Sequence, residues 1–308
     1  MNDRESDLGL GKAGVWSAAD ARLAGLTRDQ VRSRLARGEW QAMRRGTYTY
    51  GGVEPNALMR ASSAVQAVAS TGRRVVAAGR TAARVYGWPL VDDHDPATKR
   101  FEVTHDDLAV DTGRTLGATL NARRLTLRDE DVTTVQGVPV LTQLRAVADL
   151  SVLLRPDALV CVLDHVLRMG ELTEADLFSL MADRRWCPGA PALRDAVRLT
   201  DPRAESPHET LTRLVLLPVL PALRSQVEVF DRAMRLVARL DLGDESLRLG
   251  VESDGAMFHR GRATQDRRRD ARTGWTIERC SWFETRCEQR ELRARVLETA
   301  SRLARRTS

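Results

Sequence analysis

The sequence predicts a multidomain protein of mixed α+β and α/β class, with consecutive domains over residues 1–55, 56–203 and 204–308. Three observations lead to this prediction. The chain has 308 residues, whereas single hydrophobic cores usually stop growing near about 250 residues. Helical and strand-like patterns both recur along the chain. From Ser206 onward the pattern changes to one capped helix followed by several strands.

Composition is typical of a globular chain that folds in water, with 43% hydrophobic and 29% charged residues. Since no apolar run approaches the roughly 18 residues that span a bilayer, and the N-terminus lacks the apolar core of a signal peptide, we expect a cytoplasmic protein without membrane contact. Four cysteines show no metal-ligand spacing and are expected to be reduced structural thiols: Cys161, Cys187, Cys280 and Cys287.

The net charge of +6 favours an anionic partner, although a charge of this size also fits an ordinary soluble surface. Lys12 and Lys99 are the only lysines, so arginine carries nearly all of the positive charge. A guanidinium stays charged and holds a phosphate through two parallel hydrogen bonds. The sequence shows no motif for a small-molecule cofactor.

Residues 13–50 predict a small winged helix-turn-helix. Ser17 marks one helix start, Gly25 a turn, and Thr27 with Gln30 a capping box that opens a second helix. The next stretch alternates apolar and polar residues, as the two strands of a wing would. In such domains the second helix enters the major groove and the wing contacts the DNA backbone.

Six arginines lie between residues 28 and 45, and four of them are predicted nucleic-acid contacts: Arg28, Arg32, Arg44 and Arg45. A solvated face of a small structural domain is the alternative, because Asp29 and Glu39 offset part of this charge.

Residues 57–200 predict a linking region with few groups suited to chemistry. His94, His105 and His165 have no metal-ligand spacing and are expected to be structural. Helices are expected over residues 58–70, 80–86, 139–154, 156–169, 173–184 and 191–199, and strands over 75–77, 101–104, 120–123 and 132–136.

The C-terminal region predicts a mixed sheet flanked by helices. Its first helix, 206–217, has Ser206 as N-cap, Pro207 at the first position and Glu209 at the third. The expected order then continues with strands 224–230, 234–242 and 247–252, a basic helix 264–273, a strand 276–281 and a helix 290–305.

Acidic residues on adjoining strands of this sheet predict a metal site. Glu252 and Asp254 face the same way because they are two apart, and hairpin pairing brings Asp241 beside them. Converging carboxylates repel each other unless a cation neutralises them, and hard oxygen ligands suit Mg²⁺ or Mn²⁺. Such a metal polarises a scissile phosphate and lowers the pKa of its bound water. The predicted ligands are Asp241, Glu252 and Glu209.

Two further features follow this acidic cluster. His259 has an ordinary pKa near 6.5, which suits a general acid or base. Residues 260–275 carry six arginines, of which Arg267, Arg268 and Arg269 are predicted nucleic-acid contacts. Taken singly, each feature has a structural alternative: Asp254 precedes a glycine as in a turn, Glu252 could pair with an arginine, and the arginine run could be a solvated helix face.

The segments ARLDL, LRLGVESDGAMFH, DRRRD and GWTIERCSW resemble the very-short-patch-repair-like endonuclease domain of the PD-(D/E)xK superfamily, and GVWSAADARLAGL with the following residues is similar to the winged helix of AbiEi-type antitoxins. The resemblance implies a PD-(D/E)xK fold and divalent-metal hydrolysis of phosphodiester bonds. Its motif positions match Glu209, Asp241, Glu252, Asp254, His259 and Asp266.

The chain departs from the PD-(D/E)xK pattern at one position, since no lysine follows Lys99 and Asp254 stands where the motif lysine would be. The sequence therefore supports three hypotheses: a metal-dependent endonuclease or nickase acting on double-stranded DNA, a DNA-binding regulator or antitoxin-like repressor whose nuclease fold does not cut, and a nuclease acting on RNA.

Overall fold

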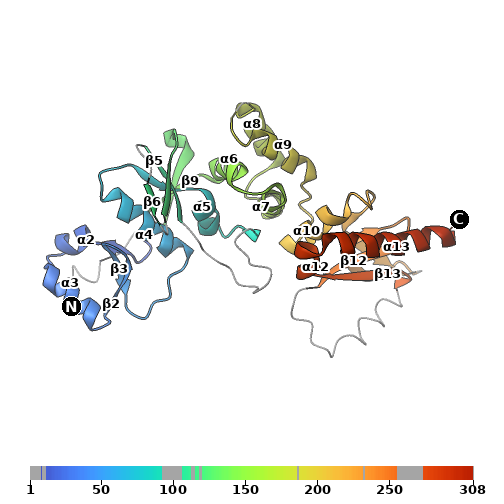
Figure 1. Cartoon of the computed structure of the whole chain (residues 1–308), viewed down its shortest axis with the longest axis horizontal. Helices are drawn as coiled ribbons and strands as arrows, with labels where there is room; N and C mark the ends of the chain where they lie inside the picture. Colours follow the sequence, from blue (N-terminus) through green and yellow to red (C-terminus); the bar gives the residue numbers. More distant parts are fainter. Residues whose placement is uncertain are drawn as a thin grey trace. The chain divides into compact units, whose positions relative to one another are not determined.

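The computed structural model describes residues 8, 12–91, 106–111, 115–117, 120–185, 187–231, 233–254 and 273–307. The chain divides into two compact units, and both contain helices and sheets, as the predicted α+β class requires (Figure 1). Unit 1 contains the described residues up to Leu90 and those of 106–153, and unit 2 contains Val91 and the described residues from Leu154 onward. Within the described residues, no helix has the length and apolarity needed to cross a bilayer.

The two units cut across the three predicted domains. The predicted N-terminal domain and much of the linking region belong to the same unit, because α4 (Ala57–Ala69) packs on the N-terminal three-stranded sheet. The hydroxyls of Thr47 and Ser63 lie 2.6 Å apart, and the Gln66 amide donates to the Val15 carbonyl at 3.0 Å. The later helices of the linking region belong instead to unit 2.

The N-terminal part of unit 1 is a three-stranded antiparallel sheet with two helices. The helix start predicted at Ser17 and the capping box predicted at Thr27 are confirmed: the Ser17 hydroxyl accepts from Asp20 N, and that of Thr27 from Gln30 N, each at 3.2 Å. In the core, Trp16 meets Trp40 edge to face at 4.8 Å. The elements are β1 (Trp16–Ser17), α2 (Ala18–Leu23), α3 (Arg28–Ala36), β2 (Trp40–Arg44) and β3 (Thr47–Tyr50), with strand order β1-β3-β2.

The rest of unit 1 is a six-stranded mixed sheet of order β6-β7-β5-β4-β9-β8. Three strands of this sheet, β5, β6 and β9, were not predicted. β5 carries adjacent acids at Asp106 and Asp107, which hid its strand pattern, and β9 occupies the start of the helix expected over 139–154. The predicted strand 101–104 lies outside the described residues. The elements are β4 (Val75–Ala77), α5 (Gly79–Tyr86), β5 (Asp106–Val110), β6 (Thr115–Gly117), β7 (Leu120–Arg124), β8 (Val132–Val135), β9 (Val138–Leu141) and α6 (Gln143–Leu153).

Unit 2 begins with helices and ends with a four-stranded sheet of order β10-β11-β12-β13. The first three strands are antiparallel, and β13 runs parallel to β12. The elements are α7 (Pro156–Arg168), α8 (Glu174–Asp183), α9 (Ala190–Leu199), α10 (Pro207–Leu216), β10 (Arg224–Phe230), β11 (Leu236–Asp244), β12 (Leu249–Asp254), β13 (Thr276–Ser281), α12 (Trp282–Cys287) and α13 (Gln289–Thr307).

Helix α10 is the centre of unit 2, and eight of its ten residues are buried. Its apolar residues pack with the sheet and α13 in one core cluster. On α7, buried Asp164 pairs with Arg213 of α10 at 3.0 Å and accepts a hydrogen bond from the Thr210 hydroxyl at 2.8 Å. Arg213 also donates to the Leu199 carbonyl at 2.7 Å. These contacts hold α10 against α7 and α9.

Burial raises the pKa of Asp164 from 3.8 to about 6. The native state therefore binds more protons than the unfolded state between these values, so its unfolding free energy falls as pH rises through this window. Relative to Asp164→Asn, we expect the wild type to lose up to about 3 kcal/mol from about pH 4 to about pH 6. Urea unfolding across this range measures the difference, and parallel curves for the two proteins would contradict it.

Candidate functional site

Two of the predicted ligands occupy neighbouring strands at the end of their pairing. β11 pairs with β12 through Leu242 and Val251, and the next position along each strand is Asp241 and Glu252. The Asp241 carboxylate accepts a hydrogen bond from the backbone N–H of Ser253 at 2.8 Å. This contact places the Asp241 side chain against the backbone that carries Glu252.

The alternation of side chains between the two faces of β11 is interrupted at Asp241. Residues two apart on a regular strand share a face, but Leu242 packs with Val251 in the core under α10, whereas Leu240 lies in a second cluster and faces Gly250. Gln226 of β10 lies opposite Asp241, between two regular pairs of the β10–β11 ladder. Its backbone has a φ of +56°. A left-handed conformation is costly for a residue with a side chain, and such strain is concentrated at functional sites.

The Glu252 side chain is only 13% exposed and forms an ion pair with Arg279 of β13 at 3.2 Å. The parallel register sets these residues directly side by side. The structural alternative considered for Glu252, a pairing with arginine, is thus present. It coexists with the position of Glu252 next to Asp241.

Glu209 does not meet the other two predicted ligands through any contact in the described residues. It is 7% exposed, and its carboxylate accepts hydrogen bonds from Glu205 N at 2.9 Å, the Ser206 hydroxyl at 2.8 Å and the Gln226 amide at 2.8 Å. These partners make Glu209 a helix-capping residue that links α10 to β10. These three bonds occupy all but about one of the lone-pair positions of the carboxylate, so Glu209 has little capacity left for a metal.

Behind the carboxylates lies a buried row of hydroxyls. The Ser253 hydroxyl is 3.2 Å from that of Thr212 on α10, which is 3.2 Å from that of Thr285 on α12. His208 closes the row, with Nε2 3.1 Å from the Thr285 hydroxyl. Burial lowers the pKa of His208, which favours the neutral ring. This row connects α10 and α12 to the residue that holds Asp241.

The two carboxylates of Asp241 and Glu252 fit Mg²⁺ or Mn²⁺, because Mg²⁺ in proteins is usually held by one or two carboxylates together with water and substrate phosphate. Among the described residues, no group of three or more His, Cys, Asp or Glu side chains is placed to hold a metal ion. The side chain of Asp254, and all of His259, Asp266, Arg267, Arg268 and Arg269, lie outside the described residues.

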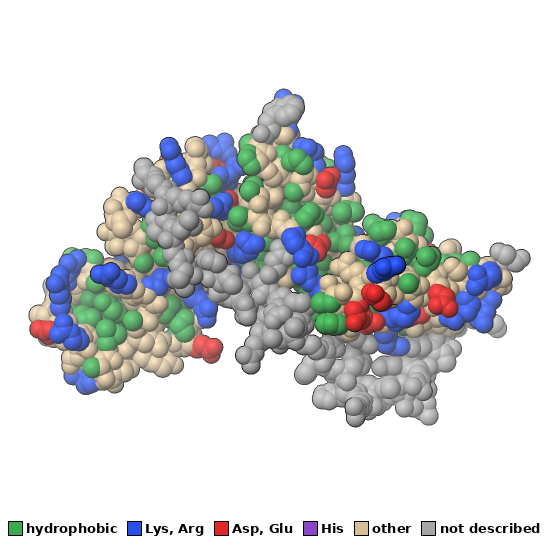
Figure 2. Space-filling view, in the orientation of Figure 1, with side chains coloured by type: hydrophobic (Ala, Val, Ile, Leu, Met, Phe, Trp, Pro, Cys, Tyr) green, Lys and Arg blue, Asp and Glu red, His purple; other side chains and the backbone are tan. Residues whose placement is uncertain are grey.

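The predicted nucleic-acid contacts in unit 1 are of two kinds. Arg28, Arg32 and Arg45 are exposed, and Lys and Arg side chains gather over α3 in the view of Figure 2. Arg44 differs from these three: its guanidinium forms an ion pair with buried Asp106, and its side chain is only 18% exposed. At the β2–β3 hairpin, Arg45 is thus exposed, whereas Arg44 attaches the hairpin to β5.

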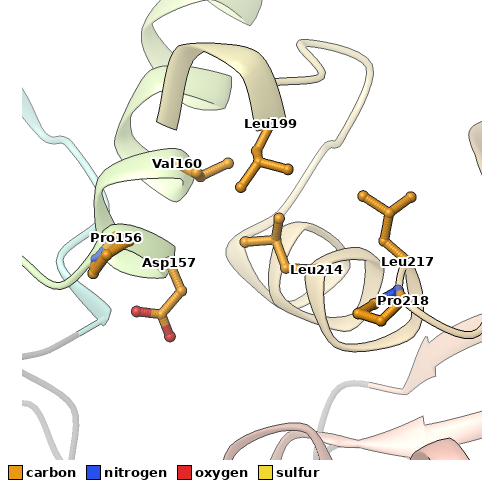
Figure 3. Close-up of a pocket in the computed structure, with 7 residues that line it drawn as sticks. All are labelled: Pro156, Asp157, Val160, Leu199, Leu214, Leu217 and Pro218. Atoms are coloured by element: carbon orange, nitrogen blue, oxygen red, sulfur yellow. The ribbon is translucent and has the colours of Figure 1, made fainter. Parts of the chain in front are cut away.

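An apolar hollow of about 410 Å³ lies elsewhere in unit 2, between α7, α9 and α10 (Figure 3). Val160, Leu199 and Leu214 point toward one another across it. Its ionisable lining residue, Asp157, is bound to Arg155 at 2.5 Å and lies 3.6 Å from Arg286. The hollow offers apolar contact area and is separate from the carboxylate pair.

No known family model and no curated protein matches this chain. The site therefore has to be interpreted from its own geometry. Sequence reasoning did not identify Gln226, Ser253 or Arg279, whose importance comes from a backbone angle and from strand register. His208 carried one available signal, since it directly precedes Glu209 on a helix that was predicted to be capped.

Because Glu209 satisfies three donors, replacing it by Ala should lower the unfolding free energy by about 1 to 3 kcal/mol. Glu298→Ala, on the exposed surface of α13, is the control and should change it by less than about 0.5 kcal/mol. Urea unfolding measures both variants. A Glu209→Ala protein as stable as the wild type, or more stable, would show that Glu209 is not a capping residue.

Proposed function

We propose that the chain is a metal-dependent DNA endonuclease or nickase, with a PD-(D/E)xK-like site in unit 2 and a DNA-binding winged helix in unit 1. The observation that carries the proposal is the placement of Asp241 and Glu252 on the neighbouring strands β11 and β12, each at the position next to the last pair of the ladder. The Ser253 N–H donates a hydrogen bond to the Asp241 carboxylate. A divalent ion held there would polarise the scissile phosphate and supply a nucleophilic water.

The topology of unit 2 supports this proposal. A buried helix precedes three antiparallel strands, and a fourth strand adds in parallel next to β12 and leads into α12 and α13. This is the order predicted from the sequence, with α12 in addition and apart from the predicted basic helix 264–273, which falls outside the described residues. Asp241 and Glu252, which match motif positions of the resemblance, lie on β11 and β12.

The N-terminal elements support the DNA-binding half of the proposal. Helices α2 and α3 are followed by the β2–β3 hairpin, which is the order of a winged helix. No side chain of α3 is fully buried, and Arg28 and Arg32 are exposed on it. Arginine on an exposed helix and at a hairpin tip suits contacts to phosphate.

A DNA-binding regulator with a non-cutting nuclease fold is the second candidate. Two observations favour it: the carboxylate of Glu209 is engaged in capping, and Glu252 is held by Arg279. The two candidates differ in one measurable property, because both bind DNA but only the first turns it over with a metal.

Plasmid nicking with Mg²⁺ or Mn²⁺ tests the proposed function. Asp241→Asn and Glu252→Gln should each lower the rate by about a hundredfold or more, the usual cost of losing one preorganised group at a reacting phosphate or carbonyl. Glu228→Gln, an exposed acid on β10 of the same sheet, should keep the wild-type rate.

Cleavage that survives both site substitutions would contradict the assignment of the site. A wild-type protein that binds DNA without metal-dependent nicking would favour the regulator. Parallel assays with double-stranded DNA, single-stranded DNA and RNA assign the substrate class.

Adjacent arginines of the wing should behave differently. Arg45→Ala should weaken binding to a mixed-sequence duplex and reduce the slope of log affinity against log salt by about 1. Arg44→Ala should instead destabilise the protein by about 3 kcal/mol, because it leaves Asp106 buried without its guanidinium partner. Fluorescence anisotropy at several salt concentrations and urea unfolding measure these effects. The reverse assignment of the two effects would refute this model of the wing.

A further inference from the structure

The candidate site contains a cation that does not come from the PD-(D/E)xK motif. The motif position two residues after Glu252 holds Asp254, and no lysine occurs after Lys99. Among the described residues, Arg279 places a positive charge beside Glu252, which it reaches from the adjacent parallel strand at 3.2 Å. The Arg279 side chain is 29% exposed, so part of it is accessible from solvent.

A cation beside the carboxylates can act in two ways, depending on whether its neighbours are the carboxylates alone or also a phosphate. Next to a metal-free carboxylate pair it lowers the repulsion between the acids. Next to a phosphate it stabilises the negative charge that develops during hydrolysis, and a guanidinium suits this role because it binds phosphate oxygens in two-pronged fashion. It cannot act as a base, because it does not deprotonate near neutral pH.

On the basis of the proposed function, we propose that Arg279 is the phosphate-contacting cation of this site and that it competes with a divalent metal for Glu252. Arg279 holds Glu252 in the metal-free protein. It releases the carboxylate when Glu252 binds the metal, and its guanidinium then contacts the substrate phosphate. One residue thus both weakens metal binding and promotes cleavage.

The proposal predicts that loss of Arg279 raises metal affinity and lowers the cleavage rate. A purely structural role would not change these two properties in opposite directions. Arg279→Gln should bind Mn²⁺ at least about fivefold more tightly, because it removes a unit charge that lies 3.2 Å from a carboxylate oxygen of Glu252. The same variant should cleave plasmid DNA about a hundredfold more slowly. Arg279→Lys should recover part of the rate, because it restores the charge but not the two-pronged contact. A structural residue would weaken both properties and would show a lowered melting temperature.

Calorimetric titration with Mn²⁺ alone and nicking assays on the full chain measure the two effects. Arg239→Gln is the matched control, because Arg239 lies on β11 and pairs with Glu205 at 3.0 Å rather than with a site carboxylate. It should leave Mn²⁺ affinity unchanged. Mn²⁺ affinity that is equal or weaker in a folded Arg279→Gln protein would overturn the competition.

The calorimetric result does not depend on turnover. If the wild type does not nick DNA, the proposed function fails, and tighter Mn²⁺ binding by Arg279→Gln would still establish that Arg279 and the metal share Glu252. If the wild type nicks DNA and Arg279→Gln nicks at the same rate, the phosphate-contacting role is refuted while the nuclease assignment stands.

Discussion

The ion pair between Asp164 and Arg213 fixes the helix on which the rest of unit 2 is assembled. Both side chains are almost fully buried, and further hydrogen bonds from Thr210 and from the backbone of Asp201 satisfy the carboxylate. Burying two ions costs free energy, as the raised pKa of Asp164 records. An apolar pair could fill the same space, but it would lack the directional bonds that join Arg213 and Thr210 to Asp164.

The orientation of α10 determines which of its side chains contact the sheet. One turn of the helix presents Glu209 toward Gln226 on β10, and the next presents Thr212 toward Ser253 on β12. Ser253 in turn donates its N–H to Asp241. Helix α10 therefore carries both the buried ion pair, through Arg213, and the hydrogen bonds toward the site, through Glu209 and Thr212. The irregular backbone at Gln226 and Asp241 persists because contacts from both the helix and the neighbouring strand hold it.

Local sequence patterns were sufficient to predict several strand bounds and helix caps. The bounds of β10 and β13 coincide with the predicted strands, and β10 shows the alternating burial that its sequence predicts. Ser206, Thr27 and Ser17 cap the helices they were expected to cap. Long-range pairing was beyond these patterns. Arg44 meets Asp106 across 62 positions of the chain, and Arg279 meets Glu252 only because β13 joins β12 in parallel. A residue that looks available in sequence can be neutralised by a partner that no local pattern reveals.

In the proposed nuclease, the charge arrangement at Glu252 separates the positive charge of the site from its proton acceptor. A motif lysine combines two properties, a positive charge and the ability to lose a proton. Arg279 has the first property and lacks the second. A proton released by an attacking water must therefore pass to another acceptor, such as a carboxylate, bulk water or His259. For this reason the charge of Arg279 stays constant across the accessible pH range, and any pH dependence of turnover would report the proton acceptor or the metal-bound water.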